Sequence, residues 1–123
     1  MYAKQQSGKK VMCVIKADAY GHGAVRSGLY LQSIGADAFA VACLAEAVEL
    51  REAGIARPLL IMGYTAPEYA QILAKHALIQ AVQDEGSAAA LALEAQKAKV
   101  EIDVHVKLDT GMGRTGIFAQ GEP

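Results

Sequence analysis

The 123-residue sequence has no tryptophan, only two cysteines and three prolines, and no long uninterrupted apolar run. A bilayer-spanning helix needs about 20 consecutive apolar residues, and charged side chains interrupt every apolar stretch, so we expect no membrane span. The N-terminus lacks an apolar stretch before a small-residue cleavage site, which predicts a cytoplasmic protein without a secretory signal. Cys13 and Cys43 lack metal-ligand spacing and are predicted to be small buried hydrophobic residues, neither disulfide-bonded nor zinc-bound.

An excess of charge of one sign is missing as well. Lysine and arginine number 12 and aspartate and glutamate 13, which gives a formal net charge of −1. Without a basic run, and without tryptophan for base stacking, a nucleic-acid partner is not expected. At 53% apolar and 20% charged residues the chain is predicted to fold, as no more than one domain.

Short apolar segments alternate with helical ones along the chain. Strands are predicted at residues 11–15, 38–42, 57–62, 78–82 and 101–108, and helices at about 24–34, 44–53, from 67 onward and 84–97. The first strand is a nearly continuous apolar run, which predicts burial on both of its faces. No element is expected before it, and a polar loop precedes the last residues, 120–123.

This alternation favours βαβ units with a parallel sheet. The two options are an open doubly wound sheet and part of a (β/α)₈ barrel, and a whole barrel takes about 250 residues. Five strands therefore predict either a small open-sheet domain or about half of a barrel, and the abrupt ends favour the fragment.

Lys16 lies at the carboxyl end of the first predicted strand, where barrels and open α/β sheets assemble their active sites. A partly desolvated lysine there can present a neutral, nucleophilic amine that condenses with an aldehyde. From position alone, a lysine that simply reaches into water is the simpler interpretation. Gly21 and Gly23 follow it and allow a sharp turn away from the strand.

The string KADAYGHG at residues 16–23 resembles the signature of alanine racemases, which are fold-type III pyridoxal-phosphate enzymes. The similarity continues through residues 40–42, 46–47, 50–51, 54 and 58–63, and VKLDTGMGRTG at 106–116 is similar to the second hallmark of that family. Essentially the whole chain is covered. The resemblance implies a partial TIM-type barrel, pyridoxal 5'-phosphate as cofactor, and interconversion of L-alanine and D-alanine, with D-alanine supplied for peptidoglycan.

The resemblance also implies roles for single residues. Lys16 would bind the cofactor covalently and act as the catalytic base on one face of it. Tyr20 would donate a hydrogen bond to the cofactor phosphate, although a half-buried packing ring is the commoner role of tyrosine. Arg114 would bind the cofactor's phenolic oxygen and the substrate carboxylate. Lys107 would be the lysine that is carbamylated in many alanine racemases, and its negative charge would orient Arg114.

The last predicted strand has polar residues at every second position. A period of two places Asp103, His105, Lys107 and Asp109 on one face, which would point into the lumen of a barrel. The histidines at 22, 76 and 105 have no partner at metal-ligand spacing, so no metal site is expected.

Racemisation needs two acid–base groups on opposite faces of a planar intermediate. The resemblance implies that the second is a tyrosine from a C-terminal β-domain of the partner subunit in a homodimer. Residues 1–123 would then form a partial cofactor-binding barrel domain without the second barrel half or that β-domain, and the chain alone is predicted to be inactive. The alternatives are a serine or broad-specificity amino-acid racemase, and a non-catalytic α/β ligand-binding module.

Overall fold

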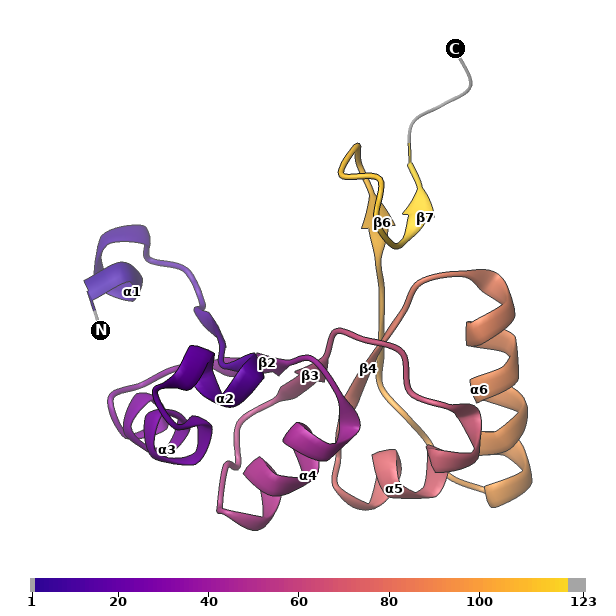
Figure 1. The fold of residues 1–123 in the computed structure, drawn as a ribbon, viewed down its shortest axis with the longest axis horizontal. Coiled ribbons are helices and arrows are strands. Elements are labelled where there is room, and N and C mark those ends of the chain that lie inside the picture. Colours follow the sequence, from indigo (N-terminus) through magenta and orange to yellow (C-terminus); the bar gives the residue numbers. More distant parts are fainter. Residues whose placement is uncertain (1, 120–123) are drawn as a thin grey trace.

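The computed structural model describes residues 2–119, so the polar end at 120–123 lies outside the described residues (Figure 1). Its main feature is one five-stranded parallel sheet in the order β1-β2-β3-β4-β5. The strands are β1 (Met12–Val14), β2 (Ala38–Val41), β3 (Leu59–Ile61), β4 (Ile79–Val82) and β5 (Val104–Val106). Each strand pairs with the one before it, whereas a doubly wound sheet reverses its order at a switch point. The prediction of a partial (β/α)₈ barrel is therefore confirmed over the open-sheet option.

The connecting helices lie against one face of this sheet (Figure 1). They are α3 (Ala24–Ser33), α4 (Leu44–Glu52), the 3₁₀ turn η1 (Pro67–Tyr69) leading into α5 (Ala70–Lys75), and α6 (Glu85–Ala98). Phe39, Leu59 and Ile61 of the strands and Leu50 and Leu73 of the helices are completely buried between the two layers. Each such side chain contributes about 1.5–3 kcal/mol by leaving water, which fixes the helices to this face.

The other face of the sheet is open. Met12 and Val14 of β1 point to it and are 40% and 41% exposed. The prediction that the first strand is buried on both faces is wrong, because within residues 2–119 helices cover only one side of it. The open face is the one that would line the inside of a barrel.

Three further details differ from the sequence-based expectations. A helix α1 (Tyr2–Ser7) precedes the first strand, where no element was expected. The last predicted strand is divided: β5 ends at Val106, and β6 (Leu108–Asp109) pairs in parallel with β7 (Ile117–Phe118) in a separate two-stranded arm (Figure 1). Cys43 is exposed at the start of α4 and not buried, whereas Cys13 is partly buried; both are free thiols.

None of the helices in the described part of the chain is long and apolar enough to cross a membrane.

Candidate active site

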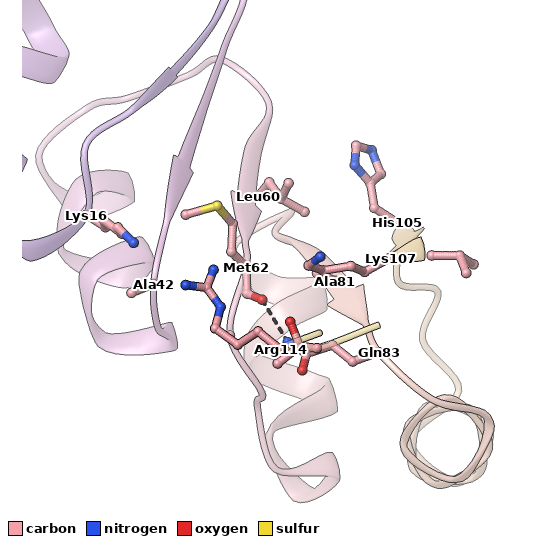
Figure 2. Close-up of a pocket in the computed structure, with 12 residues that line it drawn as sticks. Lys16, Ala42, Leu60, Met62, Ala81, Gln83, His105, Lys107 and Arg114 are labelled. Atoms are coloured by element: carbon pink, nitrogen blue, oxygen red, sulfur yellow. Dashed lines mark hydrogen bonds between the residues drawn. The ribbon is translucent and has the colours of Figure 1, made fainter. Parts of the chain in front are cut away.

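A cavity of about 480 Å³ lies on the open face, at the carboxyl ends of the parallel strands. Three of the residues singled out from the sequence, Lys16, Lys107 and Arg114, line it together. Figure 2 shows the Lys16 amine and the Arg114 guanidinium directed into the same space. From the described part of the chain, the lining consists of Lys16, Ala42, Leu60, Met62, Gly63, Ala81, Gln83, His105, Val106, Lys107, Arg114 and Thr115.

The lining is cationic at its edges and apolar at its base. Lys16, Lys107 and Arg114 bring positive charge, and among residues 2–119 no aspartate or glutamate belongs to the lining. Such a one-sign concavity attracts anions. Leu60 and Met62 contribute the apolar base because they alternate with Leu59 and Ile61, which face the helices.

The base of the cavity is held by hydrogen bonds and by one close approach. The side-chain amide of Gln83 donates to the Met62 carbonyl at 2.9 Å (Figure 2), and that of Gln80 donates to the Gly63 carbonyl at 2.6 Å. At Gly63 an added Cβ would lie 2.4 Å from the Ala42 carbonyl oxygen, so only glycine fits between the ends of β2 and β3. These contacts fix the strand ends from which the cavity is built.

Directly after Lys16 the backbone runs in a left-handed turn. The element α2 (Lys16–Gly21) contains four consecutive non-glycine residues, 17–20, with φ between 50° and 55°. A left-handed helical conformation costs roughly 1–2 kcal/mol for each such residue, so surrounding contacts must hold it. The sequence predicted a glycine-mediated turn, and Gly21 and Gly23 do have positive φ, but it gave no sign of the four strained residues before them.

Asp18 holds the far end of this turn. Its carbonyl oxygen accepts from the Gly23 amide at 2.9 Å, and its carboxylate accepts from the Ala24 amide at 2.7 Å. The carboxylate thus binds an otherwise unpartnered amide in the first turn of α3. Tyr20 projects from the turn, lies outside the cavity lining and is 61% exposed. The structure therefore does not bring Tyr20 together with the other three residues.

The loop that carries Arg114 is organised by a buried carboxylate, Asp109. Asp109 accepts hydrogen bonds from the Gly111 amide at 3.0 Å and the Gly113 amide at 3.1 Å. These two backbone hydrogen bonds lower the pKa of the Asp109 carboxyl. Because these hydrogen bonds close the loop one residue before Arg114, they fix the backbone position from which the Arg114 side chain extends.

Sequence reasoning missed Gln83, Asp109 and Glu46 as residues that shape the site. Asp109 was placed only on a strand face. Glu46, which accepts two backbone hydrogen bonds beside the cavity, gave no more signal than an acidic residue in the first turn of a helix. Within residues 2–119 no group of histidine, cysteine and acidic side chains could hold a metal ion.

The sheet order, the one-sided helices and the lysine at a strand end define the class: a partial (β/α)-barrel domain with a cavity, lined in part by cationic side chains, at the carboxyl ends of its strands. Residues 1–122 match the model of the family described as alanine racemase, N-terminal domain. The chain belongs to this family.

Known proteins with similar sequences and structures agree with this membership. The chain is 49% identical over 107 residues to alanine racemase 1 of Caldanaerobacter subterraneus subsp. tengcongensis, across 87% of this chain and 28% of that protein. It is 44% identical over 108 residues to the serine/alanine racemase of Enterococcus gallinarum, across 88% of this chain and 15% of that protein. The crystal structure of alanine racemase from Oenococcus oeni superposes with a TM-score of 0.86 at 32% identity, across 96% of this chain and 34% of that one. The chain thus spans about a third or less of the length of these proteins.

Proposed function

We propose that this chain carries the cofactor-binding and substrate-binding half-barrel of an alanine racemase that depends on pyridoxal 5'-phosphate and interconverts L-alanine and D-alanine. The observation that carries the proposal is the convergence of Lys16, Lys107 and Arg114 in one cavity, in a chain of this family. A cytoplasmic location and a role in supplying D-alanine for peptidoglycan are part of the proposal.

The residues present fit this cofactor. A volume of about 480 Å³ lies within the ~300–1,000 Å³ typical of small-molecule sites. The apolar base suits a planar ring, the cationic edges suit its anionic groups, and Lys16 offers an amine to its aldehyde. When bound, pyridoxal phosphate supplies an electron-accepting ring that makes the α-hydrogen of an amino acid acidic.

Each of the four residues has a task in this proposal. The Lys16 amine takes and returns the proton at the α-carbon on one face. The Arg114 guanidinium binds the substrate carboxylate through two donors, which fixes the plane of the substrate. Lys107, once carbamylated, holds Arg114 by a charge-assisted hydrogen bond. Tyr20 lies outside the cavity lining and is 61% exposed, so in this proposal it donates its phenol hydrogen to the phosphate from beyond the lining.

Inversion also needs an acid–base group on the opposite face. We propose that it is a tyrosine of the partner subunit in a homodimer of the longer enzyme. The 123-residue chain mixed with pyridoxal phosphate and L-alanine should then give no racemisation above that of the free cofactor. Robust D-alanine formation by the chain alone would contradict this part of the proposal.

The cofactor site is tested by trapping the lysine. The purified chain is incubated with pyridoxal phosphate, reduced with borohydride and mapped by peptide mass spectrometry. We expect Lys16 to be labelled well ahead of Lys107 and of the exposed Lys75, which serves as a surface reference. Equal labelling of all lysines would overturn the cofactor proposal and favour the non-catalytic module.

A serine racemase is the second candidate, favoured by the similarity to the serine/alanine racemase of Enterococcus gallinarum. The two are separated in a chimera in which this chain replaces the matching segment of the Caldanaerobacter subterraneus alanine racemase. We expect the chimera to racemise alanine faster than serine, and Lys16→Ala to abolish both activities. Faster turnover of serine would favour the second candidate.

A further inference from the structure

We propose that Glu46 is a positioning residue for Lys16: its carboxylate ties the strained turn after Lys16 to the end of β2. The Ala17 amide, directly after Lys16, donates to one oxygen of Glu46 at 2.8 Å. The Ala42 amide donates to the other oxygen at 2.7 Å. Ala42 also lines the cavity, so one side chain joins two sides of the site. This inference rests on the proposed function, because it assumes that the Lys16 amine reacts.

The backbone around Ala17 requires such a partner. Ala17 has φ 50° and ψ 54° and is the first residue of the left-handed turn. An alanine left to itself avoids this conformation, and a change in the turn would move the Cα of Lys16 and re-aim its side chain. A carboxylate suits the task because its two oxygens accept separate hydrogen bonds and, when ionised, form stronger ones than a neutral acceptor.

Capping of α4 does not account for this arrangement. An acidic residue in the first turn of a helix commonly accepts from an amide just before that helix, and the bond from Ala42 has this character. Ala17, however, lies 29 residues earlier in another loop. The second hydrogen bond therefore has no role in α4 and acts on the backbone next to Lys16.

The test compares Glu46→Gln with Glu49→Gln. Glu49 lies one turn further along α4, is exposed, and accepts no hydrogen bond from Ala17 or Ala42, so it controls for the loss of a charge on this helix. In Glu46→Gln one acceptor becomes an NH₂ group that faces a backbone amide. We expect amide hydrogen exchange at Ala17 or Ala42 to quicken by about tenfold or more, while the Phe39 amide, bonded to Pro58, stays protected and reports an intact sheet.

The functional readout is the rate of borohydride-trapped labelling of Lys16 by pyridoxal phosphate, measured against Lys75. We expect Glu46→Gln to slow it by about tenfold or more, since a misplacement of about 1 Å can cost a reacting group up to ~100-fold, and Glu49→Gln to leave it unchanged. Labelling of Lys16 in Glu46→Gln at the wild-type rate would overturn the inference. Absence of selective Lys16 labelling in the wild type would instead overturn the proposed function.

A second variant keeps the test informative if Glu46→Gln loses its fold. Glu46→Asp retains the negative charge at the start of α4 but is one methylene shorter, so its carboxylate cannot span both amides. We expect slowed Lys16 labelling with the Phe39 amide still protected. Labelling at the wild-type rate in this folded variant would equally contradict the inference.

Discussion

Replacing Gly63 by alanine tests the close contact between the ends of β2 and β3. The added Cβ would lie 2.4 Å from the Ala42 carbonyl oxygen, and ordinary contact begins near 3.4 Å. The two strand ends would therefore have to separate by about 1 Å. The same carbonyl oxygen accepts the Gly63 amide at 3.0 Å, so this separation also weakens a hydrogen bond of the sheet.

The size of the effect follows from these two contributions. Overpacking a well-packed region costs about 1–3 kcal/mol, and a hydrogen bond contributes about 0.5–1.5 kcal/mol. We therefore expect Gly63→Ala to lower the free energy of unfolding by about 2–4 kcal/mol. At roughly 4 °C per kcal/mol for a domain of this size, the midpoint of thermal unfolding falls by about 8–16 °C.

The assay is urea unfolding followed by far-UV circular dichroism, which suits a chain without tryptophan. Gly86→Ala is the matched control: it lies in α6, and its added Cβ would meet only the end of the flexible Asp84 side chain, at 3.2 Å. Alanine also favours the helix by up to about 1 kcal/mol, so the control should unfold at the wild-type midpoint or slightly above it. An unfolding midpoint for Gly63→Ala equal to that of this control would show that the space beside Gly63 does accept a side chain.

Three other predictions concern the stability and association of the same chain. Arg51 donates to the carbonyl oxygens of Ile55, Arg57, His76 and Ala77 at 2.6–2.9 Å. Because lysine lacks the planar fork of arginine, Arg51→Lys should lower the free energy of unfolding in urea by about 1–3 kcal/mol; an unchanged midpoint would refute this. The pKa of Asp109 is lowered by the Gly111 and Gly113 amides, so its contribution is present above the unfolded value of about 3.9 and is lost as the pH falls through the folded value. Asp109→Asn should therefore flatten the acid side of the stability–pH curve, and an equally steep curve would count against it. Finally, the sheet has unpaired edges at β1 and β5 and exposes apolar residues such as Met12 and Val106. We therefore expect the isolated chain to self-associate in size-exclusion chromatography; a stable monomer would contradict that.

Much of the sheet could be predicted because its strands are short apolar runs between polar turns. Phe39, Leu59 and Ile61 are buried in the structure within strands that their sequence pattern had indicated. The position of Lys16 at the carboxyl end of the first strand could be argued from the strand pattern alone, whereas a place for Lys107 near the same site was given only by the resemblance to alanine racemases. The strands and the position of Lys16 depend on local composition and on a regular repeat, which a sequence displays directly.

The features that the sequence did not predict depend on contacts between distant residues. Ala17 and Tyr20 have no preference for a left-handed backbone, and only the folded surroundings impose it. Helix α1 is held through Lys4, which bonds Asp37 at 2.6 Å across 33 residues. The strands β6 and β7 have two residues each, which is too short for alternation to be recognised.

The hydrogen bond between Ala17 and Glu46 has a consequence for how the protein matures. Because its two partners are separated by the whole of α3 and β2, the proposed positioning of Lys16 by Glu46 can begin only after α4 has been synthesised and has docked. Reactivity of this amine toward aldehydes would thus arise late in folding, together with the packed sheet. A ribosome-bound chain stopped short of α4 would hold an ordinary flexible lysine, and the change to a selectively reactive one would mark the moment at which the first strands and helices assemble.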